Sequence, residues 1–206
     1  MKIGVPKETK PQETRVGLTP DSVKDLVSNG HKVFVENNCG FEAGFENAHY
    51  TSAGAKIVNK AEDIFYDTDI IVKVKEPLSN EVKMIKENQI VFTYFHLAAA
   101  KKLTQGLINS KSVCIAYETV TDQNGRLPLL APMSAVAGRM SVQAGAHCLE
   151  KNQKGRGLLL GGAPGVEGGT VVILGGGVVG ENAAIIATGM QAKVHIVDKS
   201  EKRLEE

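Results

Sequence analysis

The sequence predicts an α/β protein: a helix-covered parallel sheet, followed by the opening of a second α/β domain that is incomplete at the carboxy terminus. Two observations lead to this fold class. Strand-like and helix-like segments alternate through the first 130 residues, which is typical of a parallel sheet. Near the end, an apolar run enters a glycine-rich turn, a helical stretch and a second strand, and the chain ends at Glu206. We therefore place one domain at 1–130 and a linking helix with a partial second domain at 131–206.

The elements of the first domain follow from local patterns. Short runs rich in β-branched residues predict strands at 2–6, 31–36, 69–74, 89–94 and 113–117. Amphipathic stretches predict helices at 19–29, 61–66, 79–86 and 101–109. The first helix has clear end signals, because Thr19 suits the N-cap, Pro20 the first helical position and Gly30 the residue after the end.

The second domain begins after two prolines, Pro128 and Pro132, that mark the boundary. Residues 134–151 can form one long helix rich in small residues, and a glycine-rich loop, 155–169, follows it. The remainder predicts a βαβ unit, with strands at 170–174 and 193–197 and a helix at 181–190.

Composition excludes several classes of protein. The chain has 206 residues, 42% of them hydrophobic, and its net charge is +1 with no basic stripe, so we expect no nucleic-acid partner. The three cysteines show no metal-ligand spacing, which indicates reduced thiols and no metal site. Neither a signal sequence nor an apolar run of about 18 residues is present, so we expect a cytoplasmic protein without a membrane span.

The glycine-rich turn has the G-x-G-x-x-G pattern of a Rossmann fold, with glycines at Gly175, Gly177 and Gly180. Such glycines permit a tight turn and let the backbone approach a pyrophosphate at the helix N-terminus. Asp198 follows Gly180 by eighteen residues, as expected for the acid that binds an adenosine ribose and disfavours a 2′-phosphate. The pattern therefore favours NAD as cofactor, although a glycine-rich turn between two ordinary core elements has the same appearance.

Three residues of the first domain lie where parallel strands end, which is where open α/β sheets bind ligands. Arg15 follows the first strand, Lys75 ends the 69–74 strand, and His96 ends the next strand. A guanidinium and an ammonium suit a carboxylate, and an imidazole can transfer a proton near neutral pH. Each also has a structural interpretation: Arg15 and Lys75 as solvated surface charges, His96 as a half-buried histidine among apolar neighbours. From these residues alone we expect a dehydrogenase acting on an amino or hydroxy acid.

The whole chain resembles the amino-terminal part of the bacterial alanine dehydrogenase family. The resemblance is carried by ordered blocks: Ile3-Gly-Val-Pro-Lys-Glu8, Arg15-Val-Gly-Leu-Thr-Pro20, Val72-Lys-Val-Lys-Glu-Pro77, Phe92-Thr-Tyr-Phe-His-Leu-Ala-Ala99, Ala131-Pro-Met-Ser134, Val136-Ala-Gly-Arg-Met140 and Gly157-Leu-Leu-Leu-Gly-Gly162. The sequence departs from the family at Ala135, where relatives usually carry Glu.

The resemblance implies roles for individual residues. The substrate-binding arginine and lysine of the family fall on Arg15 and Lys75, and its catalytic histidine on His96. Its NAD contacts fall on Ser134, Gly175, Gly177, Val178, Val179, Gly180, Asp198 and Arg203. The implied reaction is the reversible oxidative deamination of L-alanine to pyruvate and ammonium, in L-alanine catabolism.

The resemblance also implies what this chain does not contain. The catalytic aspartate of the family and the strands that hold nicotinamide lie beyond residue 206. We therefore expect a truncated or split form with little activity alone, and a partner that is a homo-oligomer (a hexamer in full-length relatives) or a chain that supplies the carboxy-terminal part.

Two other interpretations remain. The chain could be the nucleotide-binding part of a proton-translocating nicotinamide transhydrogenase, although the context of His96 and the 136–140 block argue against this. A saccharopine-forming relative is a more distant alternative. The chain could also be a non-catalytic assembly fragment, which co-purification with a longer homologue would reveal.

Overall fold

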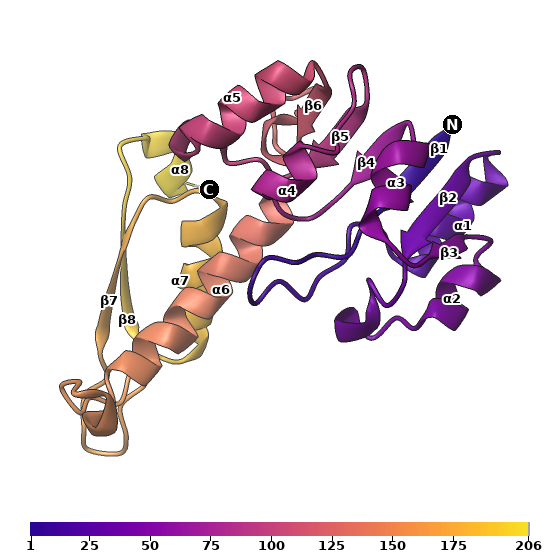
Figure 1. Ribbon diagram of the computed structural model, residues 1–206. Helices are drawn as coiled ribbons and strands as arrows, with labels where there is room; N and C mark the ends of the chain where they lie inside the picture. The colour runs from indigo at the N-terminus through magenta and orange to yellow at the C-terminus, as the bar shows by residue number, and fades with distance from the viewer. Residues whose placement is uncertain (206) are drawn as a thin grey trace. The chain divides into compact units, whose positions relative to one another are not determined.

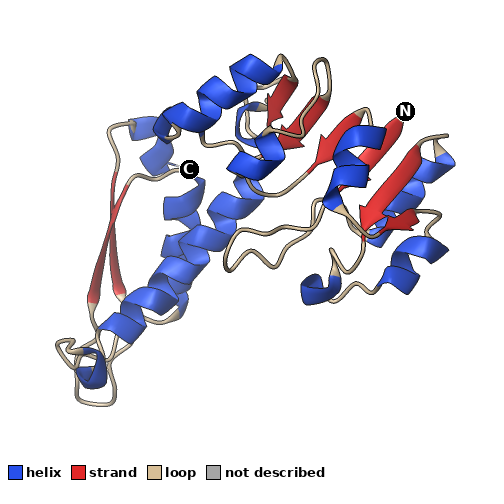
Figure 2. Cartoon of the chain, in the orientation of Figure 1, coloured by secondary structure: helices blue, strands red, loops and turns tan. Residues whose placement is uncertain are grey.

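The structure, a computed structural model, describes residues 1–205 and divides into two compact units. The first unit is Met1–Val120 and the second is Thr121–Glu206 (Figure 1). The division falls ten residues before the boundary that the prolines indicate, because the loop at 121–130 folds with the second unit. Both units are mixed α/β structures, so the predicted fold class is confirmed (Figure 2).

The first unit is built on a six-stranded sheet in the order β3-β2-β1-β4-β5-β6. Every neighbouring pair is parallel. The strands are β1 (Lys2–Val5), β2 (Lys32–Glu36), β3 (Lys56–Val58), β4 (Ile70–Val72), β5 (Ile90–Thr93) and β6 (Val113–Ala116). Because all strands run the same way, their carboxyl ends meet at one edge of the sheet.

Helices cover both faces of this sheet, as apolar strands require. They are α1 (Pro20–Ser28), α2 (Asn47–Ser52), α3 (Ala61–Asp67), α4 (Ser79–Val82) and α5 (Lys101–Ser110), with 3₁₀ turns η1 (Phe41–Ala43), η2 (Leu97–Ala99) and η3 (Tyr117–Thr119). One core cluster joins α1 and α2 to the sheet, and a second joins α3 and α5 to it. The alternation is visible on β1: Ile3 and Val5 belong to the first cluster, whereas a Cβ at Gly4 would collide with Ile64 of α3.

The local signals placed these elements well. Helix α1 begins at Pro20, and the Thr19 side chain accepts a hydrogen bond from Ser22 N, as its N-cap role predicts. Helix α4 ends earlier than predicted, because Lys86 N donates to Gln89 Oε1 (3.1 Å) and not to a helical carbonyl. The sequence analysis missed α2 and β3, which are too short to show a period.

The second unit packs two helices against a two-stranded parallel sheet. Its elements are α6 (Ala131–Cys148), η4 (Lys151–Gln153), β7 (Thr170–Leu174), α7 (Val178–Gly189), β8 (Lys193–Val197) and α8 (Glu201–Glu205). Helix α6 begins three residues before the predicted start at Ser134, because Pro132 lies in its first turn, where no N–H is needed. Gly138 allows α6 to approach α7 closely, since a Cβ there would collide with the carbonyl of Val179.

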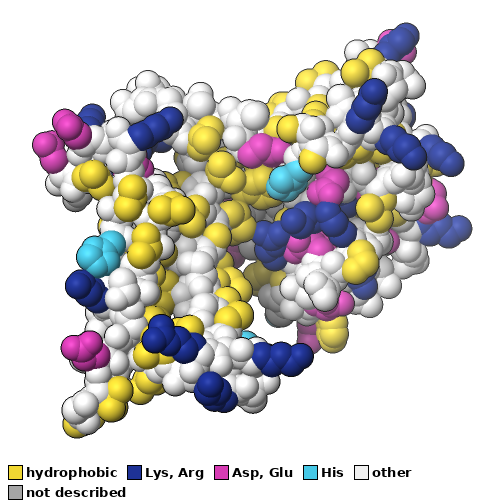
Figure 3. All heavy atoms as spheres, turned by 90° about the vertical axis from the view of Figure 1, so that its left-hand side faces the viewer, with side chains coloured by type: hydrophobic (Ala, Val, Ile, Leu, Met, Phe, Trp, Pro, Cys, Tyr) yellow, Lys and Arg dark blue, Asp and Glu magenta, His cyan; other side chains and the backbone are white. Residues whose placement is uncertain are grey.

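Apolar side chains of β7 and β8 remain exposed. Leu174 is 82% and Val172 59% exposed, and in residues 1–205 β7 pairs with β8 alone. This side of the molecule faces the viewer in Figure 3, where hydrophobic side chains reach the surface. Apolar strands of a parallel sheet are normally covered on both faces and paired with further strands.

No helix formed by residues 1–205 is both long and apolar enough to span a bilayer. The same residues contain no cluster of His, Cys, Asp or Glu that could hold a metal ion.

The three thiols differ in their surroundings, which gives a first testable prediction. Cys39 is buried, and burial, together with the charge of Glu36, raises the pKa of its thiol to about 12, so it stays protonated at neutral pH. Cys114 and Cys148 are exposed. We expect iodoacetamide to label Cys114 and Cys148 of the folded chain, and Cys39 only after denaturation, as peptide mass spectrometry will show. Labelling of native Cys39 at an equal rate would contradict this packing.

Candidate functional site

The strand order of the first unit changes direction at the middle of the sheet. The chain moves outward from β1 through β2 to β3, and outward in the other direction from β4 to β6. The carboxyl ends of β1 and β4 therefore flank a topological switch point, where ligands bind in open α/β sheets. Arg15 lies on the loop after β1, Lys75 on the loop after β4, and His96 three residues beyond the end of β5.

Arg15 is held in place by a carboxylate of its own loop. Its Nε donates to Glu13 Oε1 (2.8 Å) and its Nη2 to Glu13 Oε2 (2.6 Å). The hydrogen bond from Arg15 is the main reason that the pKa of Glu13 is lowered; burial opposes it, and the charge of Lys75 adds to it. Glu13 thus interacts electrostatically with both Arg15 and Lys75. It orients the guanidinium of Arg15, whose side chain remains 43% exposed.

Lys75 is fixed through its backbone. Glu8 Oε1 accepts hydrogen bonds from the amides of Val74 (2.6 Å) and Lys75 (3.3 Å), and the hydroxyl of Thr93 donates to the Lys75 carbonyl (2.9 Å). The loop after β1 and the neighbouring strand β5 therefore both fix the position of the Lys75 backbone, from which its side chain extends. Its side chain is only partly buried.

Beneath Lys75 lies a buried ionic network. The ammonium of Lys73, whose side chain is 1% exposed, is 3.2 Å from Glu8 Oε2 and 2.9 Å from Glu81 Oε1. Glu81 also accepts a hydrogen bond from Leu78 N at 2.7 Å. Every charge is thus paired, as a buried network requires. The network joins the loop after β1 to the loop after β4. It therefore fixes the position of the segment that carries Arg15 relative to the segment that carries Lys75.

His96 has an unusual backbone conformation. Its φ of 52° and ψ of 39° lie in the left-handed region, which is uncommon outside glycine. This conformation costs energy, so it persists only where surrounding contacts hold it. The carboxylate of Glu118 imposes it, accepting hydrogen bonds from the amides of Phe95 (3.1 Å) and His96 (2.8 Å). The imidazole is 59% exposed, and its Nδ1 lies 3.7 Å from Glu76 Oε2.

Tyr94 connects the three loops. Its ring lies 6.2 Å from that of His96 and makes an edge contact with Tyr117 at 4.9 Å. Burial raises the pKa of Tyr94, and the nearby charge of Arg15 partly offsets that rise, so the guanidinium acts on this phenol. The shared neighbours Glu13 and Tyr94 thus link all three predicted residues at the carboxyl edge of the sheet. Two cations and one imidazole there can hold a small carboxylate and move a proton.

Sequence reasoning missed the carboxylates that hold these loops and side chains: Glu8, Glu13, Glu76, Glu81 and Glu118. One signal was available. Lys73 stands in the middle of an apolar strand, and a lysine in such a position almost always has a buried acidic partner. The identity of the partners could not be found in the sequence, because Glu8 lies 65 residues away.

The second unit contains the glycine turn. Gly175 has φ of 102°, a conformation that side chains rarely adopt, and Gly177 is the N-cap of α7. A Cβ at Gly180 would collide with the carbonyl of Gly175, so only glycine lets α7 pack on the turn. A Cβ at Gly177 would meet nothing within 4 Å, so the amides at the helix N-terminus remain open to a ligand.

Asp198 closes the turn from β8. Its Oδ2 accepts a hydrogen bond from Gly176 N (2.6 Å) and its Oδ1 one from Ser200 N (2.8 Å). These two hydrogen bonds lower the pKa of Asp198, which stays ionised. Arg203 lies on α8 and lines the same hollow as Gly176 and Ile196.

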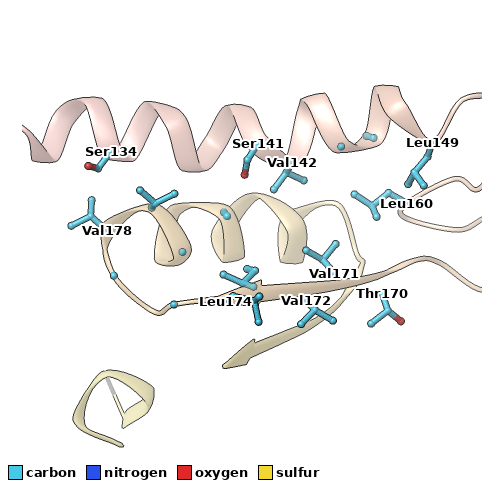
Figure 4. A pocket seen from close by; sticks show the side chains of 18 residues that line it. Ser134, Ser141, Val142, Leu149, Leu160, Thr170, Val171, Val172, Leu174 and Val178 are labelled. Carbon is cyan, nitrogen blue, oxygen red and sulfur yellow. The ribbon is translucent and has the colours of Figure 1, made fainter. Parts of the chain in front are cut away.

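A second hollow, of about 680 Å³, lies between α6 and the βαβ unit. It is lined by six of the predicted cofactor residues: Ser134, Gly175, Gly177, Val178, Val179 and Gly180. Figure 4 shows Ser134 of α6 beside Val178 at the start of α7. Asp198 and Arg203 are not among its lining residues.

Comparisons with known proteins agree with this architecture. The family model described as "Alanine dehydrogenase/PNT, N-terminal domain" matches residues 4–137, and "Alanine dehydrogenase/PNT, C-terminal domain" matches residues 141–206. The chain is 54% identical over 205 residues to the alanine dehydrogenase of Halomonas elongata, covering 100% of this chain and 55% of the relative. It is 52% identical over 204 residues to that of Methanococcus maripaludis, covering 99% and 55%.

Solved structures give the same result. An L-alanine dehydrogenase superposes with a TM-score of 0.92 at 54% identity, over 100% of this chain and 56% of that one. A transhydrogenase from Sinorhizobium meliloti superposes with a TM-score of 0.80 at 22% identity, over 100% and 58%, which is a likeness of fold alone. The chain thus spans about 55% of the length of the curated relatives that it matches.

Proposed function

Because the chain belongs to the alanine dehydrogenase/PNT family, we propose that it carries the substrate site and part of the dinucleotide site of an NAD-dependent alanine dehydrogenase. The proposed reaction is the reversible oxidative deamination of L-alanine to pyruvate and ammonium. The observation that supports it best is the carboxyl edge of the first sheet, where the loops after β1, β4 and β5 carry Arg15, Lys75 and His96 and share the neighbours Glu13 and Tyr94.

Arg15 and Lys75 are proposed to bind the substrate carboxylate. A guanidinium forms two parallel hydrogen bonds to a carboxylate, and an ammonium adds a third donor. Both segments are set in advance, Arg15 by Glu13 and Lys75 by Glu8 and Thr93, so little ordering remains to be done on binding. Positioning of this kind supplies much of the acceleration when two carbons must be aligned for hydride transfer.

His96 is proposed to be the general acid and base. Once Cα has lost its hydride, water adds to the resulting imine, and the imidazole takes a proton from that water as the carbinolamine forms. The imidazolium then gives that proton to the amine, and the neutral imidazole removes the hydroxyl proton as ammonia leaves and the carbonyl of pyruvate forms. An imidazole that is 59% exposed can exchange this proton with solvent.

The residues of the second unit fit a dinucleotide. The open amides at Gly177 suit a pyrophosphate, and a Cβ at that position would fill the space that it needs. The ionised Asp198 at the end of β8 suits a ribose hydroxyl and repels a 2′-phosphate, which favours NAD over NADP. When bound, NAD accepts the hydride from Cα. Ser134 and Arg203 are proposed as further contacts.

The partners and location are proposed from the same relatives. Since those relatives extend well beyond the matched part, we expect turnover to require residues equivalent to the remainder. The proposed partners are further copies in a homo-oligomer, or a chain that supplies this remainder. We propose a cytoplasmic role in L-alanine catabolism. A transhydrogenase part is the alternative, but that likeness is 22% identical against 54% for the alanine dehydrogenase. A non-catalytic assembly fragment would bind a longer homologue and show no turnover in any combination.

Turnover of L-alanine tests this proposal. The chain is co-expressed with the carboxy-terminal part of the Staphylococcus epidermidis alanine dehydrogenase, a relative 55% identical to it, beginning where the match ends. We expect L-alanine-dependent NADH formation, which His96→Ala lowers by about 10²–10⁴-fold because the proton acceptor is lost. His147→Ala, at an exposed position of α6, is the matched control and should retain activity. A soluble complex of the two chains without turnover, or one that tolerates His96→Ala, would contradict the proposal.

A further inference from the structure

We propose that Glu76 is a positioning residue that holds His96 as its Nδ1–H tautomer, leaving the Nε2 lone pair as the proton acceptor. The catalytic part of this inference rests on the role proposed for His96, whereas the tautomer is a property of the chain itself. In catalytic histidines a carboxylate on one ring nitrogen determines which nitrogen carries the lone pair.

An unsatisfied oxygen of Glu76 is the first observation. Among the described residues, Glu76 Oε2 is the buried side-chain oxygen or nitrogen that accepts or donates no hydrogen bond. Buried polar atoms are nearly always paired, so such an exception calls for a specific explanation. The imidazole Nδ1 of His96 lies 3.7 Å away. That separation exceeds a hydrogen bond, and catalytic hydrogen bonds are often long until substrate is bound.

The other oxygen of Glu76 shows that the carboxylate is charged. Lys10, on the loop after β1, donates to Oε1. Burial alone would raise the pKa of Glu76, but the hydrogen bond and charge of Lys10, together with a backbone hydrogen bond and the charge of His96, outweigh burial and lower it. An ionised carboxylate accepts hydrogen bonds and donates none, so the nitrogen that faces it is the protonated one.

Both partners are anchored independently of each other. Glu76 follows Lys75, whose carbonyl is held by Thr93 on the neighbouring strand. His96 is held in its left-handed conformation by Glu118 through its own amide. Because the backbone is fixed on both sides, the Glu76 carboxylate and the His96 Nδ1 are held near each other. Less conformational entropy is therefore lost when they interact than if both segments were flexible.

The tautomer is measurable in the 206-residue chain by two-bond ¹H–¹⁵N correlation of the imidazole rings, at an alkaline pH of about 9 where histidines are generally neutral. His49 supplies an internal reference, because its Nδ1 accepts a hydrogen bond from Glu46 N (3.0 Å) and its Nε2 must carry the proton. His96 signals are assigned by their loss in His96→Asn. We expect His96 to show the opposite pattern, with its proton mainly on Nδ1.

Glu76→Gln tests the cause. The amide keeps the shape but can present either an acceptor or a donor to Nδ1, so we expect the Nδ1–H population of His96 to fall toward the Nε2–H form. Glu87→Gln, a surface glutamate paired with Lys111, is the matched control and should leave the His96 signals unchanged. The backbone amide spectrum checks that each variant is folded.

Two outcomes of these measurements would overturn the proposed role of Glu76, whether or not the proposed function is correct. An Nε2–H pattern at His96 in the unaltered chain, like that of His49, would overturn it without any variant. Unchanged His96 signals in folded Glu76→Gln would overturn it as well. The measurement needs neither L-alanine nor NAD, so absence of turnover cannot be mistaken for failure of the tautomer.

Discussion

Replacing Lys73 by Met is expected to lower the free energy of unfolding of the first unit by about 3–5 kcal/mol. Lys73 is the cation of a buried network in which Glu8 and Glu81 are its partners. Met has a similar length and packs well, so the loss of stability does not arise from a cavity. The cost arises because two carboxylates remain in a water-poor site with no positive charge to pair with them.

Urea denaturation followed by circular dichroism measures this change. Lys83→Met, at an exposed position, is the control and should change the free energy of unfolding by less than about 0.5 kcal/mol. A triple variant, Glu8→Gln, Lys73→Met and Glu81→Gln, separates charge from packing. Its amides can still accept the backbone hydrogen bonds without a buried charge, so we expect it to be more stable than Lys73→Met. A triple variant that is less stable than the single one would show that the unpaired charges are not the cause.

Replacing Gly180 by Ala is expected to destabilise the glycine turn and to abolish dinucleotide binding. The added Cβ would collide with the carbonyl oxygen of Gly175, and backbone atoms cannot move aside as a flexible side chain can. Helix α7 must therefore separate from the turn, at a cost of about 1–3 kcal/mol. The same movement displaces the amides at Gly177, so we expect dinucleotide binding to be lost.

Gly189→Ala is the matched control, because it lies on the same helix and its Cβ would meet nothing within 4 Å. Alanine has the higher helix propensity, so this variant should be as stable as the original chain or more so. Thermal unfolding and NADH fluorescence on addition of protein report the two effects. Equal stability and equal NADH binding in Gly180→Ala would contradict the close packing of turn and helix.

Much of the fold could be predicted because its signals are local. Thr19 and Pro20 mark the start of a helix wherever the helix packs, and β-branched runs such as 170–174 predict strands without knowledge of their neighbours. The glycine spacing predicted a turn whose steric reason, the contact of Gly180 with Gly175, is also local. The limits of α4 could not be predicted, since they depend on the contact of Lys86 with Gln89.

The site was less predictable because its supports are distant in sequence. Arg15, Lys75 and His96 were selected as ends of predicted strands and by resemblance, and the sheet order explains how their loops meet. The groups that orient them come from elsewhere: Glu8 lies 67 residues from Lys75, and Glu118 lies 22 residues from His96. Their carboxylates look like ordinary surface charges until the fold buries them.

Binding of pyruvate to the first unit tests the central claim most directly, that Arg15, Lys75 and His96 serve one small carboxylate. The ¹⁵N-labelled chain is titrated with pyruvate and followed by its amide spectrum. We expect saturable shifts at Lys75, Glu76 and His96, with affinity at least about tenfold weaker in Arg15→Lys, which loses the guanidinium fork, and unchanged in Arg156→Lys at an exposed position. The absence of saturable shifts at these amides, or equal affinity in Arg15→Lys, would contradict the account.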